Sequence, residues 1–164
     1  MILFPIAKIN LGLNVVEKRP DGYHNLQTIF YPVPIKDRLE VEISSGQRFQ
    51  ALQQGNDCNL SVTGIQVQGN AEQNLVVRAY RLLKEDFPTL PPITATLHKG
   101  IPTQAGMGGG SSDGAFMLRL LNELFTLSVY DVSVMISLLN NRRSEPSLSN
   151  TGSSVLMDEF IVPS

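Results

Sequence analysis

One glycine-rich segment constrains the fold of this chain more than any other part of its sequence. Residues 99–122 read KGIPTQAGMGGGSSDGAFMLRLLN, and the loop within them has glycines at positions 106, 108, 109 and 110. An alternating apolar stretch, residues 93–97, precedes the segment and predicts a strand. Apolar residues at helical spacing follow it, namely Ala115, Leu118, Leu121, Leu124 and Phe125. The sequence therefore predicts a strand, a loop of small residues and a helix in succession.

The composition of this loop suits a bound polyphosphate. Glycines let neighbouring backbone N–H groups point inward together, and they admit an anion that a Cβ would repel. The start of a helix adds free N–H groups and a positive dipole end, worth about 0.3–1 kcal/mol per charge. We expect Ser111 and Ser112 to cap this helix or to donate to phosphate oxygens.

Two common phosphate-binding motifs do not match the segment. A Walker loop has Lys and then Ser or Thr after its last glycine, whereas Ser111 follows Gly110 directly. A dinucleotide-binding pattern read from Gly106 fails at its third glycine, where Ser111 stands. A flexible linker is the remaining alternative, and it is the weaker one because a strand and an amphipathic helix bound the loop so closely.

Residues 6–16 alternate as a strand does. Alternation places five apolar residues on one face, namely Ala7, Ile9, Leu11, Leu13 and Val15. It places four others on the opposite face, namely Lys8, Asn10, Gly12 and Asn14. If this second face lines a cleft, Lys8 would hold an anionic substrate or transition state and Asn10 would bond a hydroxyl or phosphate. A solvated face is the alternative.

Residues 19–22, RPDG, predict a turn that folds the chain back on itself. We expect Tyr23, His24 and Phe30 to return towards the same end as Lys8. Two aromatic rings and a histidine suit a nucleobase, through stacking and hydrogen bonds to its edge. Packing in the core or at its rim is the alternative for each of them.

The rest of the chain predicts a two-layer α+β domain. Residues 39–43 alternate as a strand, residues 44–59 predict a hairpin loop or an exposed strand pair, and residues 60–62 and 65–67 predict short strands around Gly64. Asn74 is expected to open a helix that ends near Pro88. Residues 128–164 are rich in serine and without sustained periodicity, so we expect a poorly ordered tail.

Composition excludes several classes of protein. A net charge of −2 argues against a nucleic-acid surface, and the single cysteine, Cys58, excludes an internal disulfide framework and suits a reducing compartment. The apolar start lacks a basic region before it, and no run is long enough to span a bilayer. We therefore expect a cytoplasmic protein with no nucleic-acid partner and no membrane contact.

Four stretches in colinear order resemble the GHMP kinases: AKINLGLN (7–14), RPDGYHNLQTIF (19–30), NLVVRAYRLL (74–83) and IPTQAGMGGGSSDGA (101–115). The resemblance covers residues 1–127 and implies the family's N-terminal domain, with strands on one side and helices on the other. The GYH element resembles the members that act in non-mevalonate isoprenoid (terpenoid) biosynthesis. It implies ATP-dependent phosphorylation of the 2-hydroxyl of 4-diphosphocytidyl-2-C-methyl-D-erythritol.

The resemblance also implies site residues. Lys8 matches the active-site lysine, Asn10 a substrate-contacting asparagine, and Asn74 a position near the adenine. The residues on the cytidine side are Tyr23, His24 and Phe30. The ATP phosphate loop corresponds to Pro102, Thr103, Gln104, Ala105, Gly106, Met107, Gly108, Gly109, Gly110, Ser111 and Ser112. Mg²⁺ is implied together with ATP, and no protein ligand is assigned to it.

Residues 128–164 depart from the family pattern. Family members continue into a segment like LGADxPFF, whose aspartate acts with the lysine as catalytic base, and into a second lobe with a third glycine-rich motif. Neither occurs here, and nothing around Glu145 matches. A truncated chain or a shifted reading frame is one hypothesis. Because losing a general base costs about 10²–10⁴-fold in rate, we expect this form to be weakly active or inactive.

Three further expectations accompany this departure. We expect the 164-residue form to self-associate through exposed apolar surface. A non-catalytic nucleotide-binding remnant is the first alternative function, because it would keep the same phosphate loop without the chemistry. A nucleic-acid or ribosome-associated α+β module is the second, and the net negative charge disfavours it.

Overall fold

The computed structural model describes residues 1–18, 24–44, 57–67 and 69–127, and these residues form an α+β fold. Its elements are β1 (Ile2–Leu3), β2 (Ile6–Lys18), β3 (His24–Lys36), β4 (Arg38–Ile43), β5 (Cys58–Gly64), the 3₁₀ helix η1 (Ala71–Gln73), α2 (Leu75–Asp86), β6 (Ile93–Lys99) and α3 (Gly109–Phe125). The predicted turn at 19–22, Tyr23, most of the predicted loop 44–59 and the predicted tail 128–164 lie outside the described residues.

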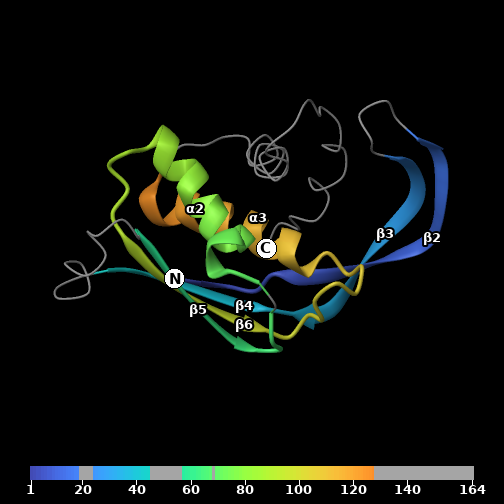
Figure 1. Ribbon diagram of the computed structural model, residues 1–164, viewed down its shortest axis with the longest axis horizontal. Helices are drawn as coiled ribbons and strands as arrows, with labels where there is room; N and C mark the ends of the chain where they lie inside the picture. The colour runs from blue at the N-terminus through green and yellow to red at the C-terminus, as the bar shows by residue number, and fades with distance from the viewer. Residues whose placement is uncertain (19–23, 45–56, 68, 128–164) are drawn as a thin grey trace.

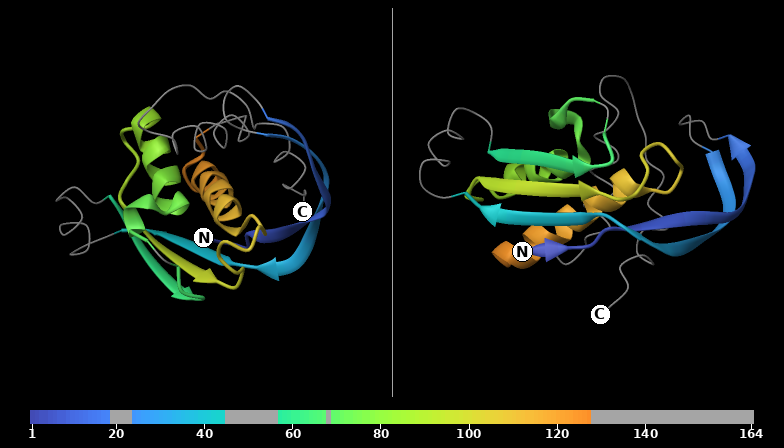
Figure 2. Two further views of the ribbon diagram at one scale, coloured as in Figure 1. Left: turned by 45° about the vertical axis from the view of Figure 1, so that its right-hand side comes forward. Right: turned by 90° about the horizontal axis from the view of Figure 1, so that it is seen from below.

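Four strands form a sheet in the order β1-β4-β6-β5, and both helices cover one of its faces (Figures 1 and 2). β4 runs antiparallel to β6, whereas β5 runs parallel to it, and Ala95 of β6 faces Val41 on one side and Leu60 on the other. The predicted two-layer α+β architecture is confirmed. Because β6 is a central strand, its carboxyl end carries the glycine-rich loop from the middle of the sheet towards α3.

The core lies between the sheet and the two helices. β6 alternates as predicted, with Ile93, Ala95 and Leu97 buried. The predicted helix after Asn74 is also confirmed, because the Asn74 side chain accepts a hydrogen bond from the backbone N–H of Val76 at 3.0 Å and thereby caps α2. The remaining residues of this core are Leu39, Val41, Cys58, Leu75, Val76, Val77, Ala79, Tyr80, Leu82, Leu83, Leu90, Ala115, Met117, Leu118, Leu120 and Leu121.

β2 and β3 form a separate two-stranded ribbon that arches away from the sheet (Figure 2). Its register is interrupted at Gly12, which has φ +70°: Leu11 pairs with Ile29, but Leu13 pairs with Thr28. This β-bulge moves Leu13 onto the face of Asn10. The strict alternation predicted for residues 6–16 is therefore wrong beyond Gly12, because a bulge depends on pairing with a partner strand.

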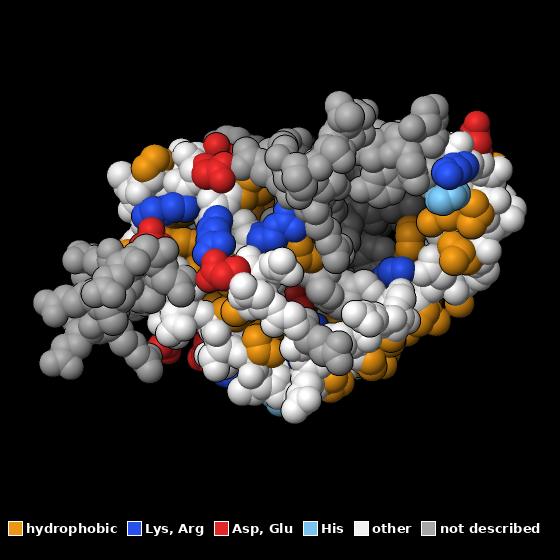
Figure 3. Space-filling model, viewed as in Figure 1, with side chains coloured by type: hydrophobic (Ala, Val, Ile, Leu, Met, Phe, Trp, Pro, Cys, Tyr) orange, Lys and Arg blue, Asp and Glu red, His pale blue; other side chains and the backbone are white. Residues whose placement is uncertain are grey.

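The ribbon exposes apolar side chains, which Figure 3 shows along its outer part at the right of the view. The exposed residues are Leu11, Leu13, Val15, Val16, Leu26, Ile29 and Tyr31. Only Ala7 at the start of β2 joins the buried core. The apolar half of the predicted pattern thus faces solvent over most of the ribbon.

Two local predictions, the strand at 65–67 and the loop as far as residue 59, need correction. The expected strand at 65–67 is absent, because Gly64 turns with φ +79° and the N–H of Ile65 then donates to the carbonyl of Lys99. Cys58 belongs to β5, and burial raises its thiol pKa to about 12, so the thiol is inert at neutral pH. No described helix combines the length and apolarity needed to cross a membrane.

Candidate functional site

Lys8 of β2 lies directly against the glycine-rich loop. Its backbone N–H donates to the carbonyl of Met107 at 3.0 Å, and its ammonium donates to the carbonyl of Gly106 at 3.0 Å. The same ammonium donates to the Asn10 Oδ1 atom at 2.6 Å. The first long strand and the loop, which the sequence separates by about a hundred positions, therefore form one site.

The loop lies close to Lys8, in a backbone conformation that favours glycine. Gly108 has φ +71°, and a Cβ built there would lie 3.3 Å from Lys8 Cε. Gly106 also has φ +71°, and this left-handed conformation strongly disfavours residues with a Cβ. The glycines thus let the backbone turn across the lysine side chain.

The predicted serine cap of α3 is wrong. Gly108 is the N-cap residue, and the structure shows no side-chain cap there. Ser112 lies within the first turn, where its N–H donates to the carbonyl of Gly108 at 2.9 Å. The first backbone N–H groups of a helix have no partner within the helix, so an uncapped start leaves them available to an anion.

Hydrogen bonds orient Asn10 towards Lys8. The Asn10 Nδ2 atom donates to Thr28 Oγ1 at 3.1 Å, and that hydroxyl donates to the carbonyl of Gly12. Because its amide nitrogen is bound in this way, Asn10 presents its oxygen to the lysine. The bulge at Gly12 therefore supports the position of Asn10, although it interrupts the strand register.

Two features of its surroundings act on the Lys8 ammonium. The ring centroid of Phe30, the cross-strand neighbour of Asn10, lies 4.9 Å from the Lys8 nitrogen, a cation–π geometry. Burial lowers the pKa of Lys8 from its ordinary value. The structure thus brings together Lys8, Asn10, Phe30 and the loop, as predicted.

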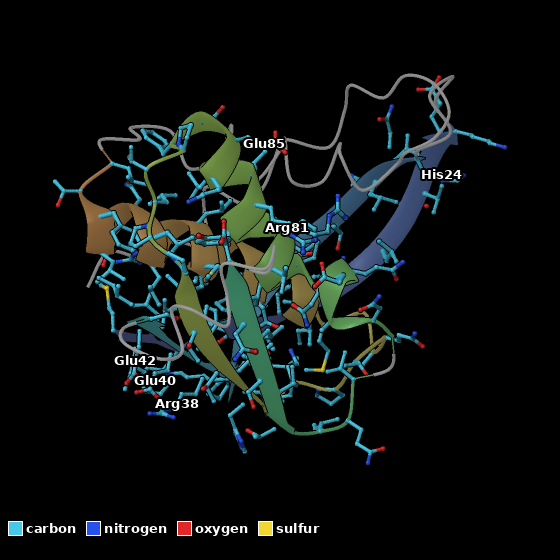
Figure 4. All side chains as sticks on the ribbon, turned by 60° about the vertical axis from the view of Figure 1, so that its left-hand side comes forward. His24, Arg38, Glu40, Glu42, Arg81 and Glu85 are labelled. Carbon is cyan, nitrogen blue, oxygen red and sulfur yellow. The ribbon has the colours of Figure 1, made fainter. Side chains whose placement is uncertain are left out.

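The structure does not bring His24 to the same end of the strand as Lys8. His24 pairs with Lys18 at the far end of the ribbon, and Figure 4 shows it near the ribbon tip. The expectation that it returns beside Lys8 is wrong, because β2 continues for ten residues beyond that lysine. Tyr23 lies outside the described residues.

The predicted loop residues differ in exposure. Residues 102–106 are exposed on the loop, whereas Gly109 is buried. A Cβ at Gly110 would lie 4.0 Å from Leu75 Cδ1, so the start of α3 lies beside the start of α2. Asn74, the α2 cap, therefore stands near the loop, with its side-chain oxygen engaged in capping.

A buried charge cluster beneath the loop was not predicted. The Lys99 ammonium bonds Asp37 and also donates to Asp113 Oδ2 at 2.7 Å. Lys99 and Asp113 are each 3% exposed, and Asp37 is 1% exposed. Asp37 Oδ1 also accepts the N–H groups of Gly100 at 2.6 Å and Ile101 at 2.8 Å.

The cluster is not electrically balanced if both carboxyl groups are ionised. Burial first, and then the nearby charge of Asp37, raise the pKa of Asp113 to about 7, although Lys99 acts in the opposite direction. Asp113 Oδ1 is the one buried side-chain atom without a hydrogen-bond partner within the described part of the chain. The described residues contain no group of three or more His, Cys, Asp or Glu side chains that could hold a metal ion.

Comparison with known proteins agrees with this geometry. The model of the GHMP kinases N terminal domain matches residues 74–151. The chain is 54% identical over 133 residues to the 4-diphosphocytidyl-2-C-methyl-D-erythritol kinase of Bacteroides fragilis. This alignment covers 80% of this chain and 45% of the relative. It is 49% identical over 130 residues to the enzyme of the same name from Parabacteroides distasonis, over 79% of this chain and 44% of the relative.

Solved structures agree as well. A crystal structure of 4-(cytidine 5'-diphospho)-2C-methyl-D-erythritol kinase matches with a TM-score of 0.67 and 34% identity, over 85% of this chain and 46% of that one. Streptococcus pneumoniae phosphomevalonate kinase shares the fold, with a TM-score of 0.56 and 15% identity over 87% of this chain and 43% of that one. The chain spans about half the length of the curated relatives it matches. On its sequence and on its fold, the chain resembles the N-terminal domain of the GHMP kinases.

Proposed function

We propose that the protein is the ATP-binding half of a kinase that phosphorylates the 2-hydroxyl of 4-diphosphocytidyl-2-C-methyl-D-erythritol. One observation carries the proposal: the Lys8 ammonium lies 3.0 Å from the carbonyl of Gly106, within the glycine-rich loop. A cation at a loop of small residues suits the transfer of a phosphoryl group, which depends mainly on positioning and electrostatics. The names of relatives about half identical to this chain support the choice of substrate.

The residues present fit a triphosphate. The start of α3 has no side-chain cap, and a Cβ at Gly108 would press on the Lys8 side chain. We propose residues 102–112 as the phosphate loop, with N–H groups at the start of α3 donating to phosphate oxygens. Mg²⁺ bound with ATP would neutralise part of the phosphate charge. Among the described residues, no cluster of acidic side chains could bind the ion on its own.

The chain's own side chains would then act on the acceptor. Lys8 neutralises charge between the acceptor hydroxyl and the phosphoryl group, and its lowered pKa also makes proton exchange with that hydroxyl easier. Asn10 keeps the lysine in place and can bond the acceptor hydroxyl. Exchanging the Gly106 carbonyl for a phosphate oxygen would bring the ammonium onto the reacting group.

Contacts to the rest of the substrate follow the ribbon. Phe30 stands beside Lys8 and suits the acceptor end. His24 and Tyr23 remain proposed contacts to the cytosine, and Asn74 remains a proposed neighbour of the adenine. The ribbon arches along the side of the molecule where α3 begins (Figure 2). Its tip therefore bends and does not point directly away from the glycine-rich loop.

A phosphoryl-transfer assay with ATP and the cytidyl diphosphate substrate tests the proposal. We expect Lys8→Ala to reduce transfer about 10²–10³-fold, the typical effect of removing one preorganised donor. Lys84→Ala is the matched control, because it removes a lysine from the last turn of α2, away from the loop. Transfer that Lys8→Ala leaves unchanged would contradict the proposal. ATP binding without any transfer would favour the alternative of a non-catalytic nucleotide-binding remnant.

A further inference from the structure

We infer that the buried cluster of Lys99, Asp37 and Asp113 is the positioning element of the glycine-rich loop, and that Lys99 sets nucleotide affinity without touching the nucleotide. The effect on affinity rests on the proposed function, whereas the effect on the loop does not. These three residues lie outside the set matched to the phosphate loop.

The cluster holds both ends of the loop. Lys99 is the last residue of β6, directly before the loop, and Asp113 lies in the first turns of α3, directly after it. The Lys99 ammonium joins them through Asp113 Oδ2 at 2.7 Å. This bond fixes the separation of the two loop ends, so the turn between them has few shapes available.

Asp37 fixes the direction in which the loop leaves the sheet. It lies between β3 and β4, and its Oδ1 atom accepts the N–H groups of Gly100 and Ile101, the first two residues after β6. Its other oxygen bonds Lys99. A single carboxylate thus connects the edge of the ribbon, the end of the central strand and the start of the loop.

Lys99 acts from beneath the loop and not from its surface. It is 3% exposed, and a Cβ built on Gly109 would lie 3.4 Å from its nitrogen and 2.9 Å from Ile101 Cγ2. The start of α3 therefore rests on the lysine and on Ile101. From this position Lys99 can set where the N–H groups of the helix start point, but solvent and ligands do not reach it.

Within the cluster, Lys99 matters most for the position of the loop because of its charge. Its ammonium bonds both buried carboxyl groups, and Asp113 Oδ1 has no hydrogen-bond partner among the described residues. Without Lys99, protonation of Asp113, whose pKa burial already raises to about 7, would still leave the buried Asp37 carboxylate without its cation, and removing one partner of a buried pair costs far more than the net value of the original pair. The nearest way to relieve it is to let the loop and the start of α3 move apart.

Amide hydrogen exchange without ATP tests this inference on the full chain. Lys99→Met keeps the length of the side chain and removes its charge. We expect exchange at residues 100–108 to become about tenfold faster or more, while amides inside α2 change little. Arg119→Met is the matched control, since Arg119 pairs with Glu123 on the exposed side of the same helix, and we expect no change in the loop.

A rescue variant separates charge from packing. Adding Asp113→Asn to Lys99→Met replaces the second carboxyl group with a neutral amide, whose NH₂ group can donate to the Asp37 carboxylate, so we expect it to restore part of the protection in the loop. If Lys99 acted only through the packing of its aliphatic side chain, the second substitution would not restore protection in the loop. Equal exchange in the wild type and Lys99→Met, or no recovery in the double variant, would overturn the inference.

Nucleotide binding gives a separate readout. We expect Lys99→Met to weaken ATP binding about tenfold or more, and to raise KM for ATP more than it lowers kcat. Undiminished ATP affinity in a Lys99→Met variant with a loosened loop would overturn the claim that Lys99 sets affinity. A wild-type chain that binds no ATP would overturn the proposed function, and the exchange comparison would still decide the loop claim.

If Lys99→Met does not fold, amide exchange in the wild type tests whether the cluster positions the glycine-rich loop. The amides of Gly100 and Ile101 donate to Asp37, so we expect them to exchange as slowly as those of β6. Exchange at the rate of an unprotected loop would overturn the inference.

Discussion

The ammonium of Lys8 and the carbonyl oxygen of Gly106 lie 3.0 Å apart, joining the first long strand to the glycine-rich loop. The backbone N–H of the same lysine bonds the next loop residue, Met107. The lysine therefore holds the loop through both its main chain and its side chain. Because the ammonium already bonds a loop carbonyl, it stands where a phosphate oxygen could take over that contact.

A pair of glycine substitutions should separate backbone strain from displacement of Lys8. Gly106 and Gly108 both have φ +71°, but only at Gly108 would a Cβ meet the lysine, at 3.3 Å from its Cε atom. We expect Gly106→Ala and Gly108→Ala to lose similar stability, about 1–2 kcal/mol, in urea unfolding. Gly108→Ala should weaken ATP binding further, as measured by calorimetry. Equal affinities of the two variants would contradict this geometry.

Removing the cap of α2 should destabilise the fold. Asn74 bonds the N–H of Val76, next to the buried start of the helix. We expect Asn74→Ala to lower the free energy of unfolding by about 0.5–2 kcal/mol. Asn70→Ala, which removes a similar bond to the N–H of Glu72 at an exposed 3₁₀ turn, should cost less. A larger loss at Asn70 than at Asn74 would argue against this assignment of the cap.

Asp113 should make stability depend on pH. Burial raises its pKa from 3.8 to about 7, so between these values the folded state holds a proton that the unfolded chain has released. The contribution of Asp113 to stability is therefore present below about pH 4 and is lost as the pH rises towards 7.

Comparison with Asp113→Asn isolates this effect, because the variant does not titrate at that position. We expect the unfolding free energy of the wild type minus that of Asp113→Asn to fall between about pH 5 and 7, by at most about 1.4 kcal/mol per pH unit. It should be constant above about pH 8. A difference that is flat throughout, or that rises with pH, would show that Asp113 is ionised in the folded protein.

The exposed apolar ribbon should drive self-association. Leu13 is 60% exposed and Ile29 is 66% exposed, within a larger group of apolar side chains on β2 and β3 (Figure 3). We expect the wild type to associate with rising concentration in sedimentation velocity, and Leu13→Lys to shift it towards monomer. A wild type that stays monomeric at all concentrations would refute this expectation.

Elements whose signal is local could be predicted from the sequence. Periodicity alone was sufficient for α2, α3 and β6, because each buries one regular face against the core. The approach of Lys8 to the glycine-rich loop was also expected and is confirmed. Features that depend on a partner strand were missed: nothing local to Gly12 reveals that Leu13 would pair with Thr28.

The buried charge cluster left a signal that could have been recognised. Lys99 continues the buried alternation of Ile93, Ala95 and Leu97, so its side chain had to enter the core. Asp113 likewise shares a helical face with Met117 and Leu120. A charge in phase with buried positions needs a buried partner, and here the two charges are partners of each other. Asp37 could not have been assigned, because 62 residues separate it from Lys99.

Amide hydrogen exchange at Gly106–Ser112, with and without ATP, tests the central claim most directly. If the loop and the start of α3 bind phosphate through their backbone N–H groups, ATP should slow exchange at these positions and leave the arched ribbon beyond Gly12 largely unchanged. Exchange at Gly106–Ser112 that saturating ATP does not alter would contradict the account.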